Sequence, residues 1–271
     1  MDIPLTLIVE LILLGTVTGF LAGLLGIGGG MVMVPALTWL LSGRGVAPGL
    51  DVKMAIATAM STILFTSLSS LRAHHQRGAV RWPLVRSFAP GILIGGVVAG
   101  AGAFAVVKGQ GLAAVFAGFT AFSAAQMLAD RKPKPTRTLP GPVGRAGVGG
   151  AIGFVSGLVG AGGAFVSVPY MIWCNVPVRE AVGTSAALGF PIALANTAGY
   201  LIGGWNQPAA LPGAVGYLYL PALAIIATIS VVVAPQGARV AHSIDTRKLK
   251  RIFALVLFCL SAYMLYKATG H

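Results

Sequence analysis

Eight long apolar stretches dominate this chain of 271 residues and limit what it can fold into. They cover residues 4–42, 54–71, 87–107, 111–129, 147–174, 181–202, 214–236 and 252–266. A helix needs about 20 apolar residues to cross a bilayer, and several of these stretches reach that length. Only 9% of the residues are charged, against roughly 25% in soluble domains, which excludes a water-facing surface. The sequence therefore predicts an all-α polytopic membrane protein.

The net charge of +13 comes from basic residues between the apolar stretches. A nucleic-acid-binding surface would need these bases on one face with interleaved aromatics, so we expect cytoplasmic loops and no nucleic acid. Cys174 and Cys259 lie inside apolar stretches without partner spacing, which predicts reduced thiols and no disulfide or metal framework. The N-terminus has no basic segment before its apolar run, so no cleaved signal peptide is expected.

Two glycine-rich segments repeat one another. Residues 19–36 (GFLAGLLGIGGGMVMVPA) and 153–170 (GFVSGLVGAGGAFVSVPY) are identical at ten of eighteen positions without gaps. Further along, AIATAMS at 55–61 matches AVGTSAA at 181–187, after an eight-residue insertion in the first half. Self-similarity of this kind predicts a duplicated chain. We expect a first membrane repeat at 1–130, a basic cytoplasmic linker at 131–146 and a second membrane repeat at 147–271.

The positive charges predict how the two halves insert. If all eight stretches cross once, Lys and Arg divide ten to nine between the two sides, which gives no orientation. If the first and fifth stretches break at their glycine clusters and return, the division becomes fifteen to four. Each half is then one broken-helix hairpin plus three transmembrane helices, an odd number of crossings, so the repeats are inverted. Both termini are then periplasmic or extracellular.

The second hairpin also favours this topology. Its arms, at 147–160 and 164–174, are each expected to be too short to span the bilayer. The first arm of the first hairpin is long enough to span, so its depth stays open.

The glycine clusters GIGGGM (26–31) and GAGGAF (160–165) allow three readings. A dinucleotide-binding fingerprint needs a preceding strand and an acidic residue about 20 positions on, and the sequence has neither. Close helix packing is the second reading. The third is a break within the membrane, where the returning helix offers unpaired N–H groups and a positive dipole end to an anion. A proline follows the cluster in both halves, which favours the third reading.

We therefore expect a substrate-binding site between two hairpin tips. Its predicted backbone residues are Gly28, Gly29, Gly30 and Met31 in the first hairpin and Gly162, Gly163, Ala164 and Phe165 in the second. Uncharged side chains add hydrogen-bond donors, namely Thr58 and Ser61 in half one and Thr184, Ser185 and Asn196 in half two.

Acidic side chains are scarce inside the apolar stretches. Glu10 is the exception, and an intramembrane carboxylate is a candidate proton carrier, although Glu10 has no repeat counterpart and could reach the interface instead. The sequence shows no paired carboxylates, no metal-ligand spacing and no nucleophile–base pair. We expect no catalytic activity, no bound metal and no cofactor.

The blocks GLLGIGGGMVMVPAL and GLVGAGGAFVSVPYM, and the AVGTSAA segment followed by Asn196, resemble the TauE/SafE family of sulfite and organosulfonate exporters. The resemblance covers nearly the whole chain. It implies a multi-pass protein of the bacterial inner membrane that exports a small oxyanion, such as sulfite or sulfoacetate. A passive anion channel and an importer of another small organic anion are the alternatives. The expected partners are the oxyanion and the bilayer, and uncovered glycine-rich faces would also suit a homodimer.

Overall fold

The computed structural model describes residues 4–25, 29–129, 136–241 and 246–270, and it places most of them in helices. The first half contains α1 (Leu5–Leu25), α2 (Gly30–Ser42), α3 (Leu50–Gln76), α4 (Trp82–Val97) and α6 (Gly109–Ala129). A π-helical segment (Val98–Ala103) and the short α5 (Phe104–Val106) extend α4. The second half contains α7 (Pro142–Val159), α8 (Ala164–Trp173), α9 (Val178–Gly204), α10 (Leu220–Ala241) and α11 (Thr246–Ala268). Strands β1 (Ala214–Val215) and β2 (Leu218–Tyr219) pair antiparallel before α10.

Eight helices of the described ranges are long and apolar enough to cross a membrane, which confirms the predicted all-α polytopic membrane fold. Helices α2 and α8, with 13 and 10 residues, are shorter, and each comes directly after a longer helix in the chain. One expectation about length was wrong. Helix α7 begins at Pro142, inside the range expected to be linker, so its 18 residues make the first arm of the second hairpin long enough to span as well.

The break in the second hairpin depends on two glycines. Gly160 ends α7 with φ of 70°, and Gly163 precedes α8 with φ of 76°. Both angles lie in the left-handed region, which costs other L-residues roughly 1–2 kcal/mol. The Gly160 N–H donates to the Ser156 carbonyl at 2.8 Å, which closes the last turn of α7. The helix therefore ends where the glycine cluster predicts. The corresponding residues of the first hairpin, 26–28, lie outside the described ranges.

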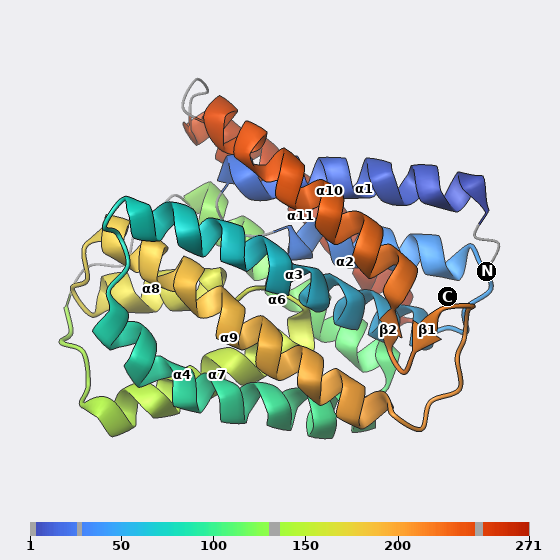
Figure 1. The fold of residues 1–271 in the computed structure, drawn as a ribbon, viewed down its shortest axis with the longest axis horizontal. Helices are drawn as coiled ribbons and strands as arrows, with labels where there is room; N and C mark the ends of the chain where they lie inside the picture. The colour runs from blue at the N-terminus through green and yellow to red at the C-terminus, as the bar shows by residue number, and fades with distance from the viewer. Residues whose placement is uncertain (1–3, 26–28, 130–135, 242–245, 271) are drawn as a thin grey trace.

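Helices of one half pack against helices of the other half, in what we call exchanged pairs. Helix α1 packs along α10, and its repeat equivalent α7 packs along α4, while α3 contacts α9 and α6 contacts α11 (Figure 1). The same close approach occurs in both exchanged pairs. A Cβ on Gly19 would lie 2.6 Å from the Cα of Ser230, and a Cβ on its equivalent Gly153 would lie 2.5 Å from the carbonyl oxygen of Ile92. Gly19 and Gly153, which are equivalent in the sequence repeat, therefore both contact the backbone of a helix from the opposite half.

Polar contacts identify two ends of the molecule. At the linker end, Arg81 Nε binds Glu180 at 3.0 Å and the Thr136 N–H donates to the Trp173 carbonyl at 3.3 Å. These contacts join the start of α4, the start of α9, the end of α8 and the segment before α7. At the terminal end, Lys267 Nζ lies 3.1 Å from a carboxylate oxygen of Asp51, near the C-terminus. Figure 1 marks both chain termini at this end.

Helices α3 and α9 run between these two ends in opposite directions. Asp51 in the first turn of α3 lies at the terminal end, whereas Glu180 in the first turn of α9 lies at the linker end. Opposite courses of repeat-equivalent helices are what inverted halves require. The inverted relation of the complete halves stays a prediction.

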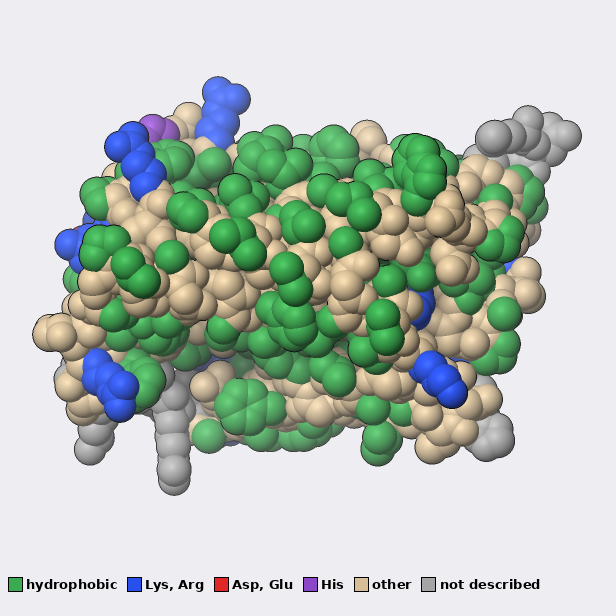
Figure 2. Space-filling view, turned by 90° about the horizontal axis from the view of Figure 1, so that it is seen from below, with side chains coloured by type: hydrophobic (Ala, Val, Ile, Leu, Met, Phe, Trp, Pro, Cys, Tyr) green, Lys and Arg blue, Asp and Glu red, His purple; other side chains and the backbone are tan. Residues whose placement is uncertain are grey.

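The outer surface fits a bilayer. Large hydrophobic side chains are exposed along the crossing helices, and on the face drawn in Figure 2 the Lys and Arg side chains gather mainly toward the ends. Tryptophans lie close to the helix ends, with Trp39 and Trp205 at the terminal end and Trp82 and Trp173 at the linker end. Tryptophan is enriched at both interfaces of a membrane, so these positions agree with helices that span it.

Candidate functional site

The tips of the two hairpins touch. A Cβ on Gly30, the first residue of α2, would lie 2.5 Å from the carbonyl oxygen of Gly160, where α7 ends. Gly160 in turn lies against the side chains of Val34 and Ile56. The start of α2 and the end of α7 therefore meet inside the fold, at a contact too close for a larger residue at position 30.

The first turn of α8 offers free backbone donors. The amides of Val166 and Ser167 donate to the Gly163 carbonyl at 3.1 and 2.9 Å. The amides of Ala164 and Phe165 have no hydrogen-bond partner among the described residues. Unpaired N–H groups at a helix N-terminus, together with the helix dipole, favour an anion. This end of α8 is therefore chemically suited to bind oxyanion oxygens.

Met31 and Phe165, which occupy equivalent positions in the two tips, belong to a second apolar cluster. This cluster is formed by Met31, Ala124, Phe253, Ala254 and Leu257, with Leu21, Val32, Phe119, Met127 and Phe165 packed against it. The rings of Phe119 and Phe165 meet edge to face with centroids 6.4 Å apart. Residues of α6 and α11 therefore cover the two tips with apolar side chains.

The paired threonines connect the halves. Thr58 Oγ1 accepts a hydrogen bond from the Tyr219 N–H at 3.0 Å, and Thr184 Oγ1 accepts one from the Arg81 N–H, also at 3.0 Å. Tyr219 directly precedes α10, and Arg81 directly precedes α4. Each threonine of a central helix therefore binds the N-terminal end of a helix from the opposite half. These hydrogen bonds give both threonines a role in the fold, and their contact with substrate stays a prediction.

The serines predicted for the site pair with hydroxyl groups. Ser61 Oγ lies 3.1 Å from Thr197 Oγ1, which links α3 to α9. Ser185 Oγ lies 2.7 Å from Ser167 Oγ, which links α9 to α8. All four side chains are buried. Two hydroxyl pairs therefore lie within the central helices, one in contact with the second hairpin.

Asn196 is fully buried between the halves. Its Nδ2 donates to the carbonyl oxygens of Gly153 and Ile192 at 3.2 and 2.8 Å, which fixes the orientation of the amide. Its Oδ1 has no partner among the described residues, and a Cβ on Gly157 would overlap this oxygen. The amide thus binds the arm of the second hairpin and keeps one acceptor unused.

The sequence comparisons agree with this architecture. Residues 11–264 match the family model described as "Sulfite exporter TauE/SafE". The chain belongs to the TauE/SafE family. A probable membrane transporter protein of Haemophilus influenzae is 32% identical over 97% of this chain and 99% of its own length. A probable membrane transporter protein of Methanocaldococcus jannaschii is 27% identical over 96% of each chain. No solved structure matches.

Two predicted site residues of this TauE/SafE protein lie apart from the tips or outside the described ranges. Glu10, the candidate proton carrier, forms an ion pair with Arg44 at 2.6 Å, and its side chain is 42% exposed. This pair holds α1 near the loop after α2 at the terminal end, away from the tips. Proton transfer by Glu10 stays a prediction. Gly28 falls within residues 26–28, outside the described part of the chain.

Three polar residues near the second hairpin were not predicted from the sequence. Ser156 is buried without a partner for its hydroxyl among the described residues. Ser167 pairs with Ser185, and the Tyr200 hydroxyl donates to the Gly157 carbonyl. A signal for Ser156 and Ser167 was present in the repeat, because the first half has Ala22 and Met33 at the equivalent positions.

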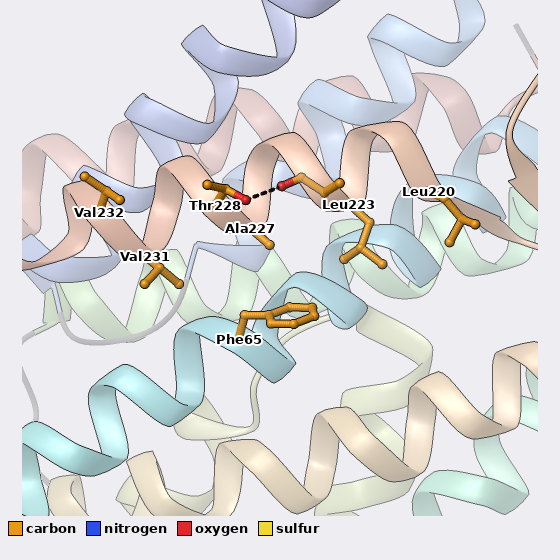
Figure 3. Close-up of a pocket in the computed structure, with 8 residues that line it drawn as sticks. Phe65, Leu220, Leu223, Ala227, Thr228, Val231 and Val232 are labelled. Atoms are coloured by element: carbon orange, nitrogen blue, oxygen red, sulfur yellow. Dashed lines mark hydrogen bonds between the residues drawn. The ribbon is translucent and has the colours of Figure 1, made fainter. Parts of the chain in front are cut away.

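A surface cavity of about 530 Å³ lies elsewhere, between α3 and α10 (Figure 3). It is lined by Phe65, Leu220, Leu223, Ala224, Ala227, Thr228, Val231 and Val232. The one hydroxyl in this lining, on Thr228, donates to the Ala224 carbonyl of its own helix at 2.8 Å. The cavity includes none of the predicted site residues, and its lining does not suit an anion.

Proposed function

We propose that this TauE/SafE protein exports a small oxyanion, such as sulfite or an organosulfonate like sulfoacetate, through a site between the two hairpin tips. The observation that carries the proposal is the meeting of the two breaks at Gly30 and Gly160 beside the unpaired first turn of α8. Irregular backbone at membrane depth is tolerated where it is buried in protein or lines a cavity, as it does at transporter sites.

The family supports the class of function. Its model is described by sulfite export, and the relatives in Haemophilus influenzae and Methanocaldococcus jannaschii are named as probable membrane transporters. Those names leave the substrate open. The oxyanion is proposed for this chain from the neutral N–H and hydroxyl donors near the tips, which match several oxygens on one small anion.

The orientation follows from charge. The linker end has more Lys and Arg residues than the terminal end. We therefore place the linker end in the cytoplasm of a bacterial cell and both termini in the periplasm. The opposite courses of α3 and α9 support inverted repeats. Because the cell interior is negative, the export of each negative charge is favoured by about 2.3 kcal/mol per 100 mV of membrane potential. Export can therefore run without a coupling ion, and a homodimer is compatible with this arrangement.

Sulfite counterflow into proteoliposomes tests the proposal. Vesicles loaded with sulfite should accumulate labelled sulfite from outside, and sulfoacetate should compete. A flux that does not saturate would indicate a channel, and accumulation driven only by other organic anions would indicate a different substrate. The absence of any substrate-driven counterflow would overturn the proposal.

A substitution at the contact between the tips should lower the rate of transport more than a substitution at the far end of α2. In Gly30→Ala the new Cβ approaches the Gly160 carbonyl, so we expect the counterflow rate to fall at least tenfold. Gly43→Ala is the matched control, because its Cβ would meet atoms of its own helix end no closer than 3.5 Å. Equal rates in the two variants would contradict a site between the tips.

A further inference from the structure

Ser156 is an unusual residue of the second hairpin. Its side chain is only 3% exposed, and its hydroxyl has no hydrogen-bond partner among the described residues. Most serines in membrane helices donate to a carbonyl of the preceding turn, as Ser123 does to Phe119 at 2.9 Å in this chain. A buried hydroxyl without a partner costs free energy, so its retention needs an explanation.

The Ser156 hydroxyl points toward the start of α8. It lies 3.1 Å from the place that a Cβ on Gly163 would occupy, and Gly163 is the residue before α8. The unpaired amides of Ala164 and Phe165 follow directly. Three neutral donors without partners thus lie within one turn of the same helix terminus.

The walls around these donors are apolar. The side chains of Ile152 and Ile192 lie against Gly163, and that of Ile63 lies against Gly162. Hydrogen bonds are stronger in such low-dielectric surroundings, and an unpaired donor there is correspondingly costly. A ligand that accepts these three hydrogen bonds is therefore favoured over an empty site.

The first turn of α2 resembles that of α8, because the Val32 and Met33 amides donate to the Gly29 carbonyl at 3.2 and 2.9 Å, but the first hairpin has no hydroxyl at the position of Ser156. Ala22 stands where the second has Ser156, and Gly29 faces the carbonyl oxygen of Thr18, 2.9 Å from the place of a Cβ. A carbonyl oxygen repels an anion. The Thr18 hydroxyl is also occupied, because it donates to the Leu14 carbonyl at 2.7 Å.

We propose that the oxyanion is bound by the second hairpin alone, through the Ser156 hydroxyl and the Ala164 and Phe165 amides, and that the first hairpin only closes the site. This inference rests on the proposed function and makes it more specific. Three neighbouring donors suit a sulfite or sulfonate group, which presents three oxygens. Because all three donors are neutral, they bind the anion without a fixed counter-charge that would hinder its release.

The test compares Ser156→Ala with Ala22→Ser, the exchange at the equivalent position of the first hairpin. In sulfite counterflow, Ser156→Ala should raise KM for sulfite at least tenfold, whereas Ala22→Ser should leave it within twofold. The melting temperature without ligand separates binding from folding. It should stay the same or rise in Ser156→Ala, because this variant removes a buried hydroxyl without a partner, and the stabilisation by added sulfite should fall.

Two results would overturn this inference while leaving the proposed function intact. One is wild-type KM and wild-type stabilisation by sulfite in Ser156→Ala, which would mean that the hydroxyl serves only the fold or a buried water. The other is a change of KM by tenfold or more, in either direction, in Ala22→Ser, which would mean that the first hairpin also contacts the anion. If wild-type protein shows no sulfite counterflow at all, the proposed function itself fails.

Discussion

The two hairpins share a fold but differ in chemistry. At the tip, Gly163 of the second hairpin is left-handed, whereas its equivalent Gly29 has the ordinary helical φ of −75°. At the base, an Arg44–Glu10 ion pair joins the arms of the first hairpin, while the Arg137 guanidinium lies 4.4 Å from the Trp173 ring centroid beside the second. The two hairpins therefore have similar sequences and different surrounding side chains.

Individual glycines of the exchanged helix pairs differ in how much room a side chain would have. Glycines of both helices meet between α7 and α4, where a Cβ on Gly91 would overlap the Ala146 carbonyl and one on Gly95 would overlap that of Gly150. Between α1 and α10, Gly15 faces the side chain and backbone of α10 at 3.1 Å or more. Both pairs include backbone contacts, since a Cβ on Gly237 of α10 would lie 2.1 Å from the Phe20 carbonyl oxygen, but Gly15 has more room than Gly91.

The largest expected effect follows from this difference. Gly91→Ala places a methyl group inside the Ala146 carbonyl, which backbone movement alone can relieve, so we expect loss of most folded protein. Gly15→Ala should lower the melting temperature only slightly. Size-exclusion chromatography and thermal unfolding in detergent measure both.

Gly147→Ala is the control on the same helix pair. Nothing lies within 4 Å of its Cβ, and alanine favours a helix by roughly 1 kcal/mol over glycine. This variant should fold as well as the wild type. Folded Gly91→Ala in normal yield would show that the α4–α7 contact is looser than described.

The paired threonines give the next largest effect. Thr58→Val leaves the buried Tyr219 N–H without a partner, which costs about 1–3 kcal/mol of unfolding free energy. Thr184→Val should cost less, because the Arg81 N–H lies in a half-buried place that water can reach. Unfolding in mixed SDS and mild detergent measures the difference, and the serine variants, which keep the hydroxyl, should be close to wild type.

Transport by the same variants separates two roles. If Thr58 and Thr184 contact the oxyanion, valine should abolish sulfite counterflow in protein that is still inserted. Wild-type KM in the folded valine variants would leave the threonines with only their contacts between the halves.

The sequence predicted the parts of this fold that depend on composition and local geometry. Apolar length gave the crossing helices, and the glycine cluster gave the break at Gly160 and Gly163, because left-handed backbone needs glycine. The partners of Thr58 and Thr184 could not be predicted, since these contacts join residues more than 100 positions apart. Ser156 escaped notice for a different reason. A missing hydrogen bond has no sequence signal, and only the difference from Ala22 in the other repeat marked the position.

The smallest expected effect concerns the base of the first hairpin. Glu10 has no counterpart in the second hairpin, where Gly144 stands at the equivalent position, so a proton carrier there would make the two halves functionally unequal. The Arg44–Glu10 pair is partly exposed, and such pairs contribute about 0–1 kcal/mol. Glu10→Gln keeps an acceptor for Arg44 and should therefore change the unfolding free energy by less than about 1 kcal/mol.

Transport as a function of pH decides whether Glu10 carries protons. With a purely structural ion pair, Glu10→Gln should transport sulfite with the pH profile of the wild type and respond equally to an imposed pH gradient. A lost response to the gradient, with normal counterflow, would instead assign proton coupling to Glu10. Because counterflow needs no net proton movement, it reports on the anion site alone. The two measurements together therefore distinguish proton coupling through Glu10 of the first hairpin from oxyanion binding at the second hairpin.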